Sequence, residues 1–90
     1  MDNLYSFLLD FFPLTDDIAD QNRVLGESLQ RAAIETLIAH NTGAPMLEKL
    51  ERLRTLLRLS HDLGYTDGDV LRYLERQLAA VAEECRSSAT

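Results

Sequence analysis

The chain has 90 residues, of which 46% are hydrophobic and 27% charged, and its formal net charge is −6 with a pI near 4.7. The hydrophobic content is typical of one small globular domain and excludes intrinsic disorder. The negative charge disfavours binding to nucleic acid phosphates and to anionic membranes, so a protein with a basic surface is the better partner. No apolar run reaches the length of a membrane span.

The first predicted element is a short aromatic helix over residues 3–12, which Pro13 should end. Only Ser6 and Asp10 give it a polar side. So short a helix, apolar nearly all round, is unstable alone in water and must be covered on more than one side. It either caps its own bundle or packs across a dimer interface or into a partner's groove, where aromatic anchors carry much of the binding energy. The predicted partner or dimer interface consists of Leu4, Tyr5, Phe7, Leu8, Phe11 and Phe12.

A second helix is predicted from about Asp16 to His40, with Thr15 as its N-cap. One polar residue, Asn22, falls on its apolar seam. Two interpretations are open: Asn22 is buried and fixes the register of packing, or it lies beyond the packed partner and is hydrated. The seam, at helical spacing, is Ile18, Asn22, Leu25, Leu29, Ala32, Thr36 and Ala39.

Residues 41–44 predict a turn, and Pro45 fits the first position of a third helix that continues to about Leu63. Gly64 fits the left-handed position that ends a helix. The third helix has an apolar seam at Met46, Leu50, Leu53 and Leu57.

Thr66 and Asp69 form a capping box, which predicts that a fourth helix begins here and runs to about Cys85 or Arg86. Its seam is Leu71, Leu74, Leu78, Val81 and Cys85. Together the seams predict an all-α antiparallel bundle of three longer helices plus the short aromatic N-terminal helix. We expect a single helical domain over residues 1–86, a disordered tail at 87–90, and a homodimer, because the apolar content is large for so short a chain.

No arrangement of residues predicts catalysis, and we expect neither an enzyme nor a cofactor. The two histidines, His40 and His61, lack the closely spaced additional ligands that a metal site needs. Cys85 is the single cysteine, and its place on an apolar seam is typical of a small buried hydrophobe, with a redox-active thiol as the alternative. One unpaired cysteine fits a reducing compartment, so we expect the protein in the cytoplasm.

A run of cations marks the third helix. It is interpreted in three ways: a solvated face with pairs inside the helix, a secondary docking surface, or a partner for the acidic N-terminal region in the same bundle or across a dimer. The stretch 66–77 also resembles a DNA-recognition helix in carrying Arg72 and Arg76, but its acidic residues would meet the phosphates. The cations of the third helix are Lys49, Arg52, Arg54 and Arg58.

Residues 23–29, Arg-Val-Leu-Gly-Glu-Ser-Leu, resemble the second helix of a family of small biofilm and acid-resistance regulators, the YmgB/AriR connector group. Residues 69–78 resemble the last helix of that family. The resemblance covers residues 4–82 and implies a dimeric helical regulator that binds a signalling protein. The arrangement is also similar to small anti-adaptor proteins, which block delivery of a sigma factor to proteolysis, and to helical bacteriocin immunity proteins.

The leading functional hypothesis is therefore a non-catalytic, bacterial or phage-encoded adaptor. It would regulate or inhibit a signalling, transcription or defence protein by stoichiometric contact. The alternative is a small structural subunit or chaperone that is stable only inside a larger assembly.

Overall fold

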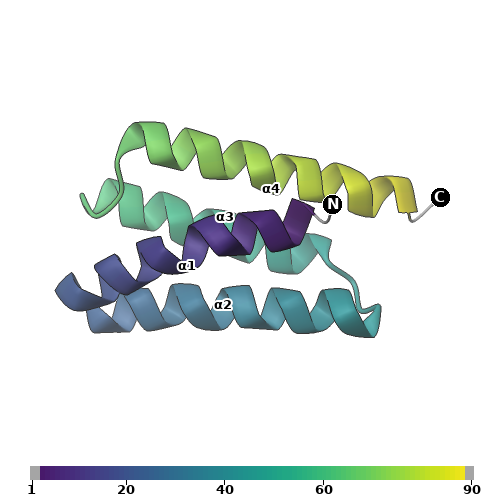
Figure 1. The fold of residues 1–90 in the computed structure, drawn as a ribbon, viewed down its shortest axis with the longest axis horizontal. Coiled ribbons are helices and arrows are strands. Elements are labelled where there is room, and N and C mark those ends of the chain that lie inside the picture. Colours follow the sequence, from purple (N-terminus) through teal and green to yellow (C-terminus); the bar gives the residue numbers. More distant parts are fainter. Residues whose placement is uncertain (1–2, 89–90) are drawn as a thin grey trace.

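A computed structural model of the chain describes residues 3–88, which form four helices and no strand. They are α1 (Asn3–Gln21), α2 (Arg23–Thr42), α3 (Leu47–Asp62) and α4 (Gly68–Ser88). Successive helices run in opposite directions, so that both ends of the chain lie at the same end of the bundle (Figure 1). α1 and α3 each pack against α2 and α4. The predicted all-α antiparallel bundle is confirmed.

The first helix is longer than predicted, because α1 continues through Pro13 to Gln21. A proline inside a helix removes one hydrogen bond and opposes the carbonyl four residues earlier, here that of Leu9. Pro13 and Leu9 are both exposed, on the side of α1 away from its buried residues. Thr15, predicted as an N-cap, is buried, and its hydroxyl donates to the Phe12 carbonyl at 2.7 Å. One buried stripe spans both sides of the proline: Leu4, Phe7, Leu8, Phe11, Thr15 and Ile18.

The break between the first two helices lies at Asn22 instead. Its extended backbone, with φ −147° and ψ 95°, separates α1 from α2, and its side-chain oxygen accepts a hydrogen bond from the Leu25 amide at 3.1 Å. Asn22 is thus the N-cap of α2, a position at which asparagine is favoured. Both interpretations of Asn22 as a seam residue inside one long helix are wrong.

Two glycines have left-handed backbones. Gly43, with φ of 74°, is the C-cap of α2, and Gly64, with φ of 87°, lies in the turn after α3. The placement predicted for Gly64 is confirmed. Pro45 lies just before the N-cap Met46 rather than at the first position of α3. None of the helices in residues 3–88 combines the length and apolar character of a membrane span.

The predicted capping box before α4 does not form. Asp67, not Thr66, precedes the first helical residue, and its carboxylate accepts from the Asp69 amide at 3.3 Å. Thr66 is buried, with its hydroxyl oxygen 2.7 Å from that of Ser60. α4 continues to Ser88, so the predicted tail at 87–90 begins inside a helix, and residues 89 and 90 lie outside the described residues.

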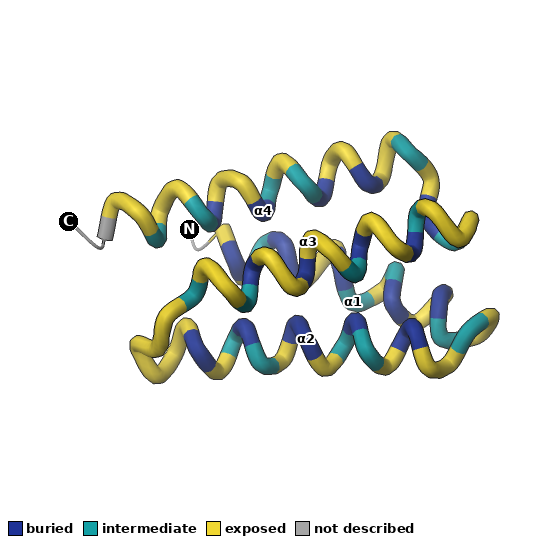
Figure 2. The backbone as a smooth tube through the Cα atoms, turned by 180° about the vertical axis from the view of Figure 1, so that it is seen from behind, coloured by how far each residue is buried: buried dark blue, intermediate teal, exposed yellow. Residues whose placement is uncertain are grey.

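The core lies along the inward sides of the four helices, where buried positions recur at helical spacing (Figure 2). The Phe7 and Phe11 rings stack at its centre with their centroids 5.0 Å apart. Of the predicted seams, only Asn22, Met46 and Cys85 are less than fully buried. The buried seam residues are Ile18, Leu25, Leu29, Ala32, Thr36, Ala39, Leu50, Leu53, Leu57, Leu71, Leu74, Leu78 and Val81.

Candidate protein-binding face

The predicted interface on the first helix is mostly inside the molecule. Leu4, Phe7, Leu8 and Phe11 are at most 5% exposed, because they face α2 and α4 and form the core of a single chain. They cannot anchor a partner while the bundle is folded. This corrects four of the six residues predicted there. Only Tyr5, which is 57% exposed, and the half-buried Phe12 remain accessible.

The accessible residues of α1 share one outer stripe. Tyr5, Leu9, Phe12 and Asp16 follow one another at intervals of four, three and four residues, which places them along one side of the helix. Leu9 is 60% exposed. Asp16 shows where the stripe lies, because its carboxylate accepts a hydrogen bond from the Gln30 amide of α2 at 2.8 Å. The stripe therefore borders α2.

A matching stripe lies along α2 and begins at Gln30, the donor of that hydrogen bond. From Gln30, steps of four and three residues lead to Ile34 and Leu37, and Ile38 lies next to them. Ile34 and Ile38 are 48% and 55% exposed, whereas Leu37 is half-buried. Because the helices are antiparallel, the two apolar stripes run side by side from the Asp16–Gln30 bond towards the end where the termini meet. We call the six residues the α1–α2 face: Tyr5, Leu9, Phe12, Ile34, Leu37 and Ile38.

Charged residues gather where this face approaches the turn between α1 and α2. α1 contains no Lys or Arg, and Asp16, Asp17 and Asp20 lie in its last two turns. α2 carries two exposed cations, Arg23 and Arg31. Within the described residues, none of these carboxylates or guanidinium groups forms an ion pair.

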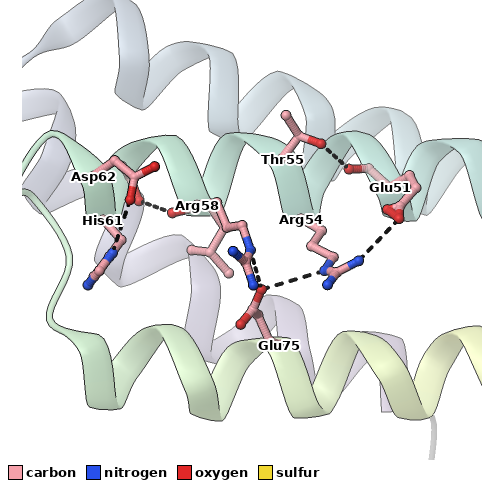
Figure 3. Close-up of polar contacts among 9 residues, drawn as sticks. Glu51, Arg54, Thr55, Arg58, His61, Asp62 and Glu75 are labelled. Carbon is pink, nitrogen blue, oxygen red and sulfur yellow. Dashed lines mark hydrogen bonds and ion pairs between the residues drawn. The ribbon is translucent and has the colours of Figure 1, made fainter.

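The cations of α3, predicted as a secondary docking surface, are occupied by carboxylates of the neighbouring helices. Lys49 and Arg52 approach Glu35 of α2 at 4.0 and 3.1 Å. Arg54 and Arg58 meet Glu75 of α4 at 3.5 and 3.1 Å (Figure 3).

α3 is thus a basic ridge neutralised from both sides. The interpretation that this ridge pairs with the acidic N-terminal region of the same bundle is wrong, because the partner carboxylates are Glu35 of α2 and Glu75 of α4. Of the pairs inside the helix that one interpretation expected, Arg54 forms one with Glu51 at 3.3 Å.

A polar cluster joins α1 to α4 on the opposite side of α1. The Tyr73 hydroxyl donates to the Asp10 carboxylate at 2.9 Å, and the Gln77 amide donates to the same oxygen at 3.2 Å. The hydrogen bond to Asp10, the negative charge of Asp10 and burial, in that order, raise the pKa of Tyr73 above its ordinary value. This cluster links α1 to α4 through the Asp10 carboxylate.

A cavity of about 510 Å³ lies where the α2–α3 connection meets the start of α1 and the end of α4. Leu4, Met46, Val81 and Cys85 supply much of its apolar lining. Burial, and then the charge of Glu84, raise the pKa of the Cys85 thiol, an effect that Arg86 partly offsets. The thiol is therefore protonated at neutral pH and a poor nucleophile.

Within residues 3–88, no group of three or more His, Cys, Asp or Glu side chains is placed to hold a metal ion. His61 lies 3.4 Å from Asp62 and has no further acidic or thiol neighbour that would complete a metal site. In the stretch that resembles a DNA-recognition helix, Arg72 is paired with Asp69 one turn away.

No protein-family model, no curated protein and no solved structure matches the chain.

Leu9, Ile34 and Ile38 were not among the predicted interface residues. Ile34 and Ile38 did give a signal: they are bulky, apolar, four residues apart, and lie off the seam of their helix. Such residues on the outer side of a helix gain nothing from burial in their own core. The prediction considered only the apolar seam of this helix, so these two outward-facing isoleucines were missed.

Proposed function

We propose that the chain is a non-catalytic regulatory or inhibitory adaptor that binds another protein stoichiometrically through the α1–α2 face. The observation that carries the proposal is the pair of adjoining apolar stripes, in which Tyr5, Leu9, Ile34 and Ile38 are each about half exposed or more. Single exposed apolar residues are ordinary on protein surfaces, but adjoining ones are typical of interaction surfaces.

The choice of residue types supports a binding role. Isoleucine has a lower helix propensity than alanine, leucine or the charged residues usual on outer helix surfaces, because its β-branch restricts χ1. Ile34 and Ile38 therefore contribute little to α2 as a helix and little to the core. Their contribution would come from burial against a partner, at roughly 25 cal/mol per Å² of apolar surface covered.

The nature of the partner follows from charge and from the resemblances. A chain with a net charge of −6 favours basic protein surfaces over nucleic acid. The resemblance to biofilm and acid-resistance regulators implies a signalling protein as the target. The free thiol of Cys85 fits a reducing compartment, and on that basis we place the adaptor in the cytoplasm.

The expected homodimer is part of the same proposal. The buried Phe7 and Phe11 can no longer provide its interface. The α1–α2 face is the apolar surface that we propose for a second copy, as for a target protein.

The proposal is tested by capturing partners from cells of the source organism with the chain and with two variants, Leu9→Gln and Ile38→Gln. We expect both variants to lose the captured protein. The matched control is Val24→Gln, because Val24 is also on α2 and is 77% exposed but lies outside the face. A captured protein that is then purified should bind the chain at one-to-one stoichiometry in calorimetry.

Equal capture by all three variants would refute the α1–α2 face as the binding surface. The alternative of an obligate structural subunit predicts a different behaviour for the chain alone. An adaptor melts cooperatively when purified, whereas a subunit that depends on its assembly is molten or aggregates.

A further inference from the structure

Both signs of unpaired charge flank the α1–α2 face. Arg23 and Arg31 of α2 have no carboxylate partner within residues 3–88, and Asp20 of α1 has no cation. The polar partner of Asp16 is the neutral Gln30 amide. By contrast, the cations of α3 are all paired. Within residues 3–88, the free charges of α1 beside this apolar surface are thus anions, whereas α2 carries two free cations and one free anion, Glu27.

These charges also lie at matching levels along the bundle. The Asp16–Gln30 hydrogen bond and the close approach of Ala19 to Gly26 fix the antiparallel register of α1 against α2. In this register Arg31 lies about two residues, or roughly 3 Å of helix rise, from the level of Asp16. Arg23 lies about as far from the level of Asp20.

We propose that a second copy of this chain covers the α1–α2 face, related to the first by a two-fold axis parallel to the helices. This inference rests on the proposed role of the face in protein binding. Under such an axis, α1 of each copy lies opposite α2 of the other, with equivalent levels facing each other. The interface is therefore self-complementary, as two-fold interfaces must be.

The two-fold axis places complementary residues of the two copies opposite each other along the whole interface. Asp16 and Asp20 of one copy face Arg31 and Arg23 of the other. Towards the end where the termini meet, the stripe of Tyr5, Leu9 and Phe12 faces the stripe of Ile34, Leu37 and Ile38. Every apolar residue of the face is covered by apolar surface, and Arg23 and Arg31 of α2 each meet a carboxylate.

The balance of charge and a comparison with the alternative axis favour this orientation. Glu27 lies on α2 between Arg23 and Arg31 and repels the same aspartates, but two cations outweigh one anion. An axis perpendicular to the helices would instead place the charged end of each face over the uncharged end near Tyr5, leaving the arginines unpaired. A target protein that uses the face then competes with the second copy.

The test measures self-association of the full chain by sedimentation equilibrium. We expect a monomer–dimer equilibrium that weakens as salt is added, because rim ion pairs are screened. Arg31→Glu should weaken the dimer about tenfold or more, and Asp16→Arg should do the same, since like charges then face each other. Arg76→Glu is the control, because Arg76 is an exposed cation of α4 that likewise forms no ion pair with any of residues 3–88.

Mixing Arg31→Glu with Asp16→Arg is decisive. In the mixed dimer, the native Asp16 of the first variant faces the native Arg31 of the second, and the introduced glutamate faces the introduced arginine. We expect the mixture to associate as strongly as the wild type, a recovery that simple destabilisation cannot produce. Should Asp16→Arg fail to melt cooperatively, Asp20→Arg with Arg23→Glu provides the same test.

A wild type that is monomeric at all concentrations, or a dimer unaffected by the charge reversals, would overturn the proposal. Weakened single variants without recovery in the mixture would overturn the two-fold orientation. The broader adaptor function fails independently, because it is judged by the loss of target capture in Leu9→Gln and Ile38→Gln. A monomer whose capture depends on those residues keeps the function and rejects the dimer.

Discussion

Gly26 lies so close to Ala19 that a methyl group on Gly26 would stand 2.5 Å from both the Cα and the Cβ atoms of Ala19. No real side-chain carbon is tolerated at such a distance, so α1 and α2 cross here backbone to backbone. This contact lies one turn from Asn22, the single residue that joins the two helices. A tight turn and a glycine at the first crossing point together make the hairpin possible.

Gly26→Ala should therefore destabilise the protein by about 1–3 kcal/mol, the usual cost of forcing an extra methyl group into a packed interface. Helix propensity alone predicts the opposite, a gain of about 1 kcal/mol. The free energy of unfolding, measured by urea denaturation with circular dichroism as the probe, shows which effect is larger. Gly68→Ala is the control, because a methyl group there would lie 3.6 Å from the nearest atom, an ordinary contact. A Gly26→Ala variant as stable as the wild type would mean that the helices can move apart freely.

Ser60 and Thr66 share a buried hydrogen bond that ties the end of α3 to the turn before α4. The Ser60 hydroxyl donates to the Leu57 carbonyl at 2.6 Å, so it must accept from Thr66. Ser60→Ala leaves the Thr66 hydroxyl buried without an acceptor and should cost about 1–3 kcal/mol. Thr66→Val removes the donor with little change of shape and should cost about 1 kcal/mol.

The double variant Ser60→Ala, Thr66→Val distinguishes this pair from a helix cap. We expect it to be more stable than the sum of the single changes predicts, since residues that share a hydrogen bond are coupled. Strict additivity in urea denaturation would contradict the pairing. Asp67→Ala tests the observed cap separately and should cost about 1 kcal/mol without coupling to Ser60.

Asp10 and Tyr73 give the protein a pH-dependent term in its stability. Because Asp10 raises the pKa of Tyr73 in the folded state, folding favours the protonated phenol. This contribution is present below the ordinary tyrosine pKa, about 10, and is lost as the pH rises through the higher folded-state pKa. Asp10→Asn should lower the pKa of Tyr73, so that the free energy of unfolding falls less steeply as the pH rises through this range.

The measurement is an alkaline titration of tyrosinate absorbance, with Tyr73→Phe used to assign the shifted component. Denaturation of the wild type and of Asp10→Asn over the same pH range then checks the linkage. A Tyr73 titration that is unchanged by Asp10→Asn would show that the hydrogen bond does not persist in solution.

Sequence periodicity predicted the helical class and most buried positions of α2, α3 and α4, because apolar seams are a property of local spacing. It missed the buried small residues Gly26, Ala33 and Ser60. It misplaced the boundary between the first two helices. The prediction took account of the strong helix-breaking tendency of Pro13 but not of the burial that a continuous helix makes possible. The burial of one stripe from Leu4 to Ile18 outweighs that cost, and it depends on tertiary contacts that no local window contains.

The same limit explains the predicted interface. An aromatic segment that is apolar nearly all round must be covered, and the sequence could not say whether its own bundle covers it. Two neighbours, α2 and α4, bury Phe7 and Phe11 completely and leave Tyr5 and Leu9 outside. Which stripe of a helix stays exposed depends on how many helices surround it. That number is set by the fold as a whole.

Pro13 offers the last test of this balance. If Pro13 lies in α1 only because burial on the opposite side of the helix outweighs its cost, Pro13→Ala should stabilise the protein. The restored backbone hydrogen bond to Leu9 and the relief of the ring clash contribute up to about 3 kcal/mol. A more flexible unfolded chain offsets about 0.4–1 kcal/mol of that gain. We therefore expect a rise in the urea midpoint at an unchanged m-value. A fall would mean that the core depends on the bend that proline imposes on α1, and that residues 3–12 pack correctly only with proline in place.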